Sequence, residues 1–169
     1  GRERNGLARC WDLAADGRLA MAPRYENYDI EVFTADGRLA HVIRRPADPV
    51  PHHPDHMAEL QAQRDELRRL EGESVTIHPH RRVVVGLSLR PDGSLWVLSS
   101  EGVRDCPPGR LGIFHVFDPA GRYSHDLTLD VDYNPERDRS VIDGRRLYIL
   151  KEACMKPATL VTTQYGNSM

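Results

Sequence analysis

The sequence is short of lysine and has no excess of charge of either sign. Lysine occurs only at Lys151 and Lys156, so arginine supplies nearly all of the 23 basic residues, against 25 acidic residues and a formal net charge of -2. Acidic and basic residues are interspersed along the chain, so no positive field arises that would attract a polyanion. A nucleic-acid partner is therefore not expected.

Cysteines and long apolar runs are scarce as well. Cys10, Cys106 and Cys154 lie far apart and form neither a disulfide framework nor a CxxC metal motif, which leaves the state of the three thiols open. No run approaches the roughly 20 apolar residues of a membrane span, and no charged-then-apolar leader opens the sequence. Because the first residue is Gly1 and not methionine, a signal peptide or lipid anchor ahead of it is also left open.

The sequence does contain a repeated hairpin signal. With 169 residues and 40% hydrophobic content, the chain is long enough to bury a core. Asp-Gly pairs at residues 16–17, 92–93 and 143–144 stand between short alternating runs, a pattern typical of tight turns that need a positive φ. A second kind of hairpin alternates with the first, because residues 30–38 (IEVFTADGR) match residues 114–122 (FHVFDPAGR) almost position for position.

These repeats predict a series of similar β-sheet units. Internal repetition on this scale is typical of propellers and solenoids, in which one unit cannot bury both faces of its sheet alone. The units are expected at about residues 7–45, 82–130 and 131–166, with four strands in each of the first two and three in the last. We therefore predict one all-β domain over residues 1–169, built from antiparallel four-stranded blades of a partial six-bladed β-propeller.

A helical insertion is expected between the first two units, over residues 54–72. This segment is rich in helix formers, with Pro54 in the first turn and Gly72 just beyond the end. Its apolar residues fall on one stripe, which either packs onto the blades or binds another protein. The stripe, a candidate partner-binding site, comprises Met57, Leu60, Leu67 and Leu70.

On these motifs the chain resembles the C-terminal half of six-bladed β-propeller proteins of the NHL and TolB-like type. The resemblance covers most of residues 7–165 and rests on YDIEVF (28–33) followed by DGR (36–38), on PDGSLWV (91–97) and on FHVFDPAGR (114–122). It implies an extracytoplasmic protein, periplasmic or secreted and often lipid-anchored. It implies no single activity, because propellers include binding modules, lyases and lactonases alike.

The chain is about half the size of such a ring. Six blades need on the order of 250 to 300 residues, and a half ring would leave two blade faces and one strand edge in water. We therefore expect the missing half of the propeller, or another protein subunit, to cover those surfaces. The three-stranded last blade would gain its fourth strand from that source.

One group of side chains has the chemistry of a metal site. His52, His53 and His56 lie with Asp55 just ahead of the predicted helix, and imidazole and carboxylate groups suit zinc, nickel or copper. Pro54 argues against a helix that begins early enough to put His52 and His56 on one face. A solvated loop with Asp55 as a first-turn acid explains the same residues without a metal, so no cofactor is expected.

No motif assigns an enzymatic reaction. Asp12, Asp92 and Asp143 would lie in hairpins near the channel of a propeller, but turn chemistry explains the two that precede glycine. Nucleophile–base pairs, paired-carboxylate motifs and phosphate-binding loops are not found in the sequence, and no catalytic residue is assigned. We expect a non-enzymatic protein-interaction module, an accessory subunit of a larger extracytoplasmic and membrane-associated assembly. The alternative is a metal-dependent hydrolase or lyase, lactonase-like or amidating-lyase-like, with its site in the propeller channel.

Overall fold

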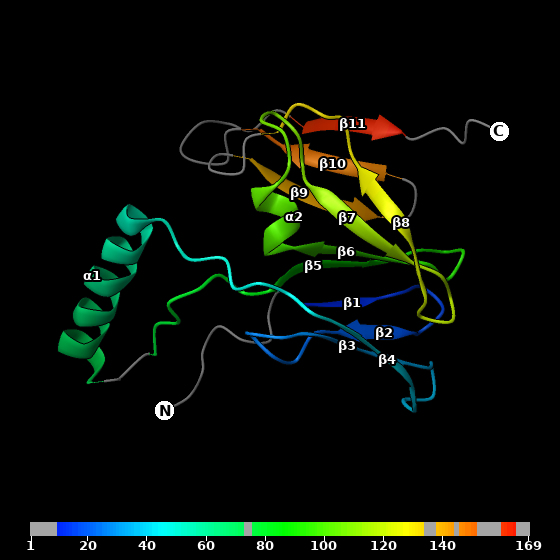
Figure 1. Cartoon of the computed structure of the whole chain (residues 1–169), viewed down its shortest axis with the longest axis horizontal. Helices are drawn as coiled ribbons and strands as arrows, with labels where there is room; N and C mark the ends of the chain where they lie inside the picture. The colour runs from blue at the N-terminus through cyan, green and yellow to red at the C-terminus, as the bar shows by residue number, and fades with distance from the viewer. Residues whose placement is uncertain (1–9, 73–75, 134–137, 144–145, 152–159, 165–169) are drawn as a thin grey trace.

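The protein is built from three antiparallel β-sheets that follow one another along the chain and lie in one stack (Figure 1). The computed structural model describes residues 10–72, 76–133, 138–143, 146–151 and 160–164. The expectation of an all-β chain with four-stranded antiparallel sheets and one long inserted helix is confirmed. Residues 7–9 of the predicted first unit and the turn at residues 144–145 lie outside the described residues.

Each sheet is a meander in which successive strands pair. The first sheet contains β1 (Trp11–Leu13), β2 (Leu19–Met21), β3 (Tyr28–Phe33) and β4 (Leu39–Arg45). The second contains β5 (Val84–Leu89), β6 (Leu95–Ser99), β7 (Ile113–Phe117) and β8 (Tyr123–Thr128). The third contains β9 (Arg139–Asp143), β10 (Arg146–Leu150) and β11 (Leu160–Gln164). The number of strands in each sheet agrees with the sequence prediction.

The hairpin turns have the backbone that their glycines predict. Gly17, Gly37, Gly93 and Gly121 all have φ between 78° and 89°, a region that side chains rarely allow. In the first turn, the Gly17 amide donates to the Ala14 carbonyl at 2.9 Å, and the three other turns repeat the same bond. The turn geometry that these four hairpins share helps to fix their register.

The first two sheets share their strand registers near the hairpin turns. Trp11 pairs with Met21 as Leu87 pairs with Val97, and Phe33 pairs with Leu39 as Phe117 pairs with Tyr123. Both sheets have a register shift just before that last pair, in β3 and in β7. Because side chains alternate between faces along a strand, corresponding residues of the two sheets lie on corresponding faces.

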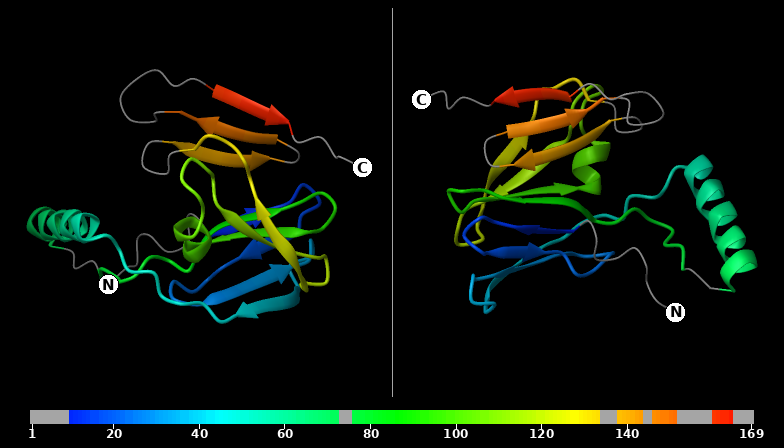
Figure 2. Two further views of the ribbon diagram at one scale, coloured as in Figure 1. Left: turned by 45° about the horizontal axis from the view of Figure 1, so that its top comes forward. Right: turned by 180° about the vertical axis from the view of Figure 1, so that it is seen from behind.

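Two hydrophobic clusters join the stack. The first cluster lies between the first and second sheets, and the second cluster between the second and third. Figure 2 shows the same order of sheets from two other directions. Buried members include Ile30, Val97 and Phe117 in the first cluster and Phe114 and Leu147 in the second. The second sheet is thus apolar on both faces and lies inside the stack.

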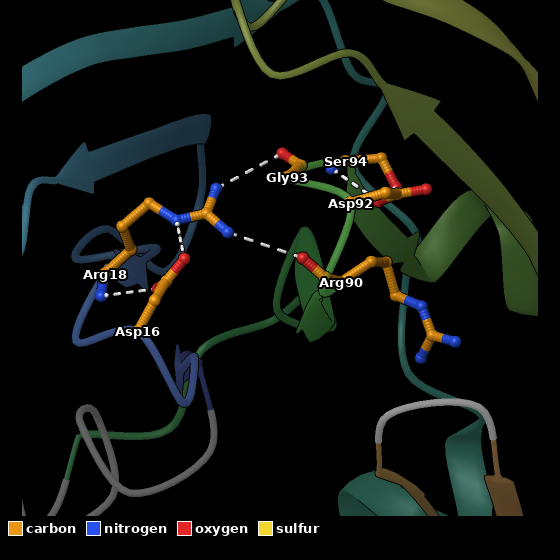
Figure 3. A network of polar contacts seen from close by, with 6 residues as sticks. All are labelled: Asp16, Arg18, Arg90, Asp92, Gly93 and Ser94. Carbon is orange, nitrogen blue, oxygen red and sulfur yellow. Dashed lines mark hydrogen bonds and ion pairs between the residues drawn. The ribbon is translucent and has the colours of Figure 1, made fainter.

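Polar contacts also connect the first two sheets, at their hairpin ends (Figure 3). The guanidinium of Arg18 donates to the backbone carbonyls of Gly93 at 3.5 Å and Arg90 at 3.4 Å. Asp16 holds this guanidinium through an Nε to Oδ2 hydrogen bond of 2.8 Å. Nearby, the Leu89 amide donates to Oδ2 of Asp12 at 2.6 Å. A backbone amide in a strand of the second sheet thus has its acceptor in the first sheet.

A second helix was not expected from the sequence. α2 (Ser100–Arg104) follows β6 directly, and the Ser99 hydroxyl caps it by accepting from the Gly102 amide at 3.0 Å. A Cβ atom on Gly102 would lie 2.2 Å from the Ile113 carbonyl oxygen, so glycine allows α2 to lie against β7.

The Asp12 bond provides a test of the contact between the first two sheets. We expect Asp12→Ala to lower the free energy of unfolding by about 1–3 kcal/mol, because it leaves the half-buried Leu89 amide unsatisfied. Asp12→Asn keeps an acceptor oxygen and should lower the free energy of unfolding by less than half of that amount. Urea unfolding of both variants measures the difference, and equal losses would show that the bond does not link the sheets.

Candidate protein-interaction site

The long helix α1 (Pro54–Glu71) begins and ends where the sequence predicts. The His53 imidazole accepts from the Asp55 amide at 3.4 Å, Pro54 occupies the first turn, and Asp55 places a carboxylate near the helix N-terminus. At the other end, Gly72 has φ 67° and its amide donates to the Arg68 carbonyl at 3.1 Å. Both ends are therefore capped within the chain.

A short two-stranded base connects α1 to the sheets. Pro51 and His80 form an isolated antiparallel bridge, and the Arg81 amide donates to the Val50 carbonyl at 2.7 Å. Val50 is buried, with 4% of its surface exposed. The chain therefore leaves the first sheet after β4, pairs with itself, forms the helix and returns through the same base to β5.

The base is anchored to the loop between β2 and β3. The rings of Tyr25 and His78 stack with their centroids 4.0 Å apart, and the Val83 amide donates to the Tyr25 carbonyl at 2.9 Å. His78 Nδ1 lies 3.3 Å from a carboxylate oxygen of Glu26. The Arg82 guanidinium lies over the Tyr25 ring. These contacts hold the base against the first sheet at the point where the insertion starts.

The predicted partner-binding stripe lies on a helix that extends away from the stack (Figures 1 and 2). Met57 and Leu60 are partly buried, whereas Leu67 is 36% exposed and Leu70 is 67% exposed. None of the described strands packs extensively against α1. Extensive packing of the stripe onto the described strands is therefore not observed, and its binding to another protein stays a prediction.

The three candidate metal ligands lie together at the start of α1. The His52 and His56 ring centroids are 5.2 Å apart, although the helix begins at Pro54 as expected. His53 is turned toward Asp55, with Nδ1 3.4 Å from its carboxylate, and His56 faces Glu59. Within the described ranges, no group of three or more histidine, cysteine or acidic side chains is arranged to hold a metal ion.

Local contacts lower the pKa of His52. Burial of the imidazole is the main cause, and the nearby His56 and Arg81 act in the same direction. The His52 amide also donates to the Pro79 carbonyl at 3.4 Å, which joins the segment before the helix to the segment after it.

The remaining candidates from the sequence have structural roles where they are described. Asp92 accepts from the Ser94 amide and hydroxyl at 2.9 and 2.7 Å and so shapes its turn. The thiol of Cys10 is buried and donates to the Val84 carbonyl at 2.9 Å, and burial raises its pKa. Cys106 is partly exposed after α2. Cys154 lies outside the described residues, as does the side chain of Asp143.

The sequence did not reveal a polar cluster between the first two sheets. The Tyr28 hydroxyl and His115 Nδ1 share a hydrogen bond of 2.9 Å, and the Arg45 guanidinium lies over the rings of Tyr28 and Tyr123 at 5.8 and 4.8 Å. Burial raises the pKa of Tyr28 far above its usual range, so the phenol stays protonated. Tyr28 is only 2% exposed, so its hydrogen bond to His115 joins the two sheets in their interior.

Searches of known protein families, of curated proteins and of solved structures found no match to this chain. Neither α1 nor α2 has the length and apolar content that a membrane crossing requires.

The polar cluster predicts how stability depends on pH. The pKa of His115 is lowered by burial first and then by Arg45, while Asp126 and Glu101 oppose the shift. The unfolded chain therefore binds a proton more readily than the folded protein, and stability is lost as the pH falls through the unfolded pKa of about 6.5. We expect the urea midpoint to fall less between pH 7.5 and 5.5 in His115→Gln than in the wild type.

The exposed His125 gives the matched control for this measurement. His125→Gln should keep the pH dependence of the wild type. If His115→Gln and His125→Gln have the same pH dependence, the fall of the urea midpoint arises from other groups, among them His52.

Proposed function

We propose that this chain is part of a six-bladed β-propeller and acts as a non-enzymatic protein-interaction module. In this proposal α1 is the element that binds the partner. The module serves as an accessory subunit of an extracytoplasmic, membrane-associated assembly, a location that rests on the resemblance to NHL and TolB-like propellers alone.

The propeller is supported by the way the sheets repeat. Each is an antiparallel meander, the first two share their registers and turns, and each sheet packs a face against the next. This repetition of one sheet unit is the arrangement that propeller blades require. Four-stranded first and second sheets agree with blades of about 40 residues.

The interaction role is carried by one observation, the exposure of the α1 stripe. Leu67 and Leu70 present apolar side chains to solvent on a helix that is capped at both ends and held on its own base. Exposed apolar side chains aligned on one helix face are typical of a surface that docks into a groove or against another helix. The charged residues around the stripe give such an interface a polar rim.

Deletion of α1 tests whether the helix is peripheral to the fold. Replacement of residues 54–71 by a short Gly/Ser linker should keep the β-sheet circular-dichroism signal and change the melting temperature by only a few degrees, because no described strand packs extensively on the helix. Loss of the β signal would show that α1 belongs to the core and would remove the basis of the proposal.

A pair of matched variants tests the stripe itself. Leu67→Glu/Leu70→Glu puts two carboxylates on the stripe, whereas Ala58→Glu/Ala62→Glu puts the same two charges on the opposite side of α1. Both variants should fold like the wild type. A partner isolated from native cells on the wild-type chain, and then purified, should bind the Ala variant normally and the Leu variant at least about 10-fold more weakly. Equal binding to both variants would overturn the assignment of α1 as the binding element.

A further inference from the structure

One face of the first sheet exposes a set of apolar side chains, which we term the open face. The register places these residues together, since Trp11 pairs with Met21, Leu13 with Leu19, and Phe33 with both Leu19 and Leu39. The exposed fractions are 52% for Trp11, 58% for Leu13 and 53% for Leu39. The open face comprises Trp11, Leu13, Leu19, Met21, Phe33 and Leu39. It lies on the side of the first sheet that is away from the second sheet.

The corresponding face of the second sheet is buried. Leu89, Leu95 and Phe117 occupy the positions of Leu13, Leu19 and Phe33, and they are 8%, 2% and 2% exposed. They are buried because they pack on the first sheet in the first cluster. The open face therefore has the pattern of an inter-sheet interface, and no described residue covers it.

The third sheet offers the complementary surface at the other end of the stack. Leu147 and Ile149 face the second sheet and are 1% and 3% exposed. The alternate residues of the same hairpin point the other way, and Val141 and Leu150 are 62% and 36% exposed. Tyr148 pairs with Val141 and lies between them on this outward face. Tyr148 occupies the position that Trp96 has in the second sheet, on the face that packs against the next sheet.

The third sheet has a basic residue at the position that Arg18 occupies in the first sheet, whereas the second sheet has Ser94 there. Arg146 directly precedes Leu147, as Arg18 directly precedes Leu19. Arg18 reaches across to the turn carbonyls of Arg90 and Gly93 in the following sheet (Figure 3). The carbonyl that corresponds to that of Arg90 is at Ala14, in the turn next to the open face, and it accepts the same turn bond from Gly17.

We propose that the open face binds the outward face of the third sheet in a second copy of this chain. The contact is head to tail, so two copies that each use both surfaces form a closed dimer of six sheets. Arg146 of one copy then reaches the Ala14 turn of the other. The surface is separate from the α1 stripe, and the second copy is chosen because this chain itself contains both complementary faces.

Sedimentation of the chain over a concentration series tests the association. The expected species at micromolar concentration has twice the mass of one chain. Leu13→Glu should raise the dissociation constant at least about 100-fold, because dimer formation would bury an unpaired carboxylate. Since Leu13 is 58% exposed in one copy, the variant should keep the circular-dichroism spectrum of the wild type. Ala62→Glu on α1 is the control, because it adds the same charge at an exposed position outside the stripe, and it should dimerise normally.

A second pair of variants tests the head-to-tail arrangement. Val141→Glu on the outward face should also prevent the closed dimer. A mixture of Leu13→Glu and Val141→Glu chains still contains one intact pair of faces and should form a heterodimer, whereas neither variant forms a homodimer alone. A monomeric wild-type chain, an open series of larger oligomers, or a Val141→Glu variant that dimerises normally would each overturn the proposal.

Discussion

The structure depends on one constraint, the need of every sheet to bury an apolar face against its neighbour. Val97 and Phe117 of the second sheet are almost fully buried against the first sheet, and Phe114 is buried toward the third. A meander of four short strands exposes both faces, so it gains little stability alone and much in a stack. The turns, the inter-sheet bonds of Arg18 and Asp12, and the cluster around Tyr28 all lie along these contacts and fix how the sheets meet.

The same constraint explains why the α1 insertion does not disturb the fold. The connection from β4 to β5 passes from one sheet to the next at the edge of the stack, where extra residues displace no buried side chain. The bridge between Pro51 and His80 closes the insertion at its base, so the strands before and after it keep their places. The insertion then costs mainly the conformational entropy of closing a loop, and this free-energy cost grows slowly with loop length. A helix of this length can therefore be carried without any packing on the sheets.

The sequence predicted the features that depend on neighbours in the chain. Alternation of apolar residues with period two, as in Ile30, Glu31 and Val32, predicted the strands, and the Asp-Gly pairs predicted the turns. Pro54 and Gly72 predicted the ends of α1 correctly, because caps are local chemistry. The sequence did not predict whether α1 packs on the sheets, because a stripe of leucines is equally compatible with packing on the same chain and with packing on another.

The features that the sequence missed arise from contacts between distant residues. His115 and Tyr28 are 87 positions apart, and only the stacking of the sheets brings the imidazole to the phenol. α2 was missed because its position depends on the absence of a side chain at Gly102 beside the Ile113 carbonyl, a contact between segments with no local pattern. The one available signal for the cluster was the repeat itself, since the second sheet has His115 at the register position where the first has Glu31.

The open face and the α1 stripe differ in what they can contribute to binding. Trp11 and Leu13 lie on a sheet whose backbone is fixed by its pairing and by the first cluster, so a partner finds them already ordered. Leu67 and Leu70 lie on a helix joined to the body only through its base, so a partner must also fix the direction of the helix. Ordering of that kind reduces affinity without reducing the area of contact. The open face is therefore suited to a lasting assembly contact, and the stripe on α1 to a partner that is held less tightly.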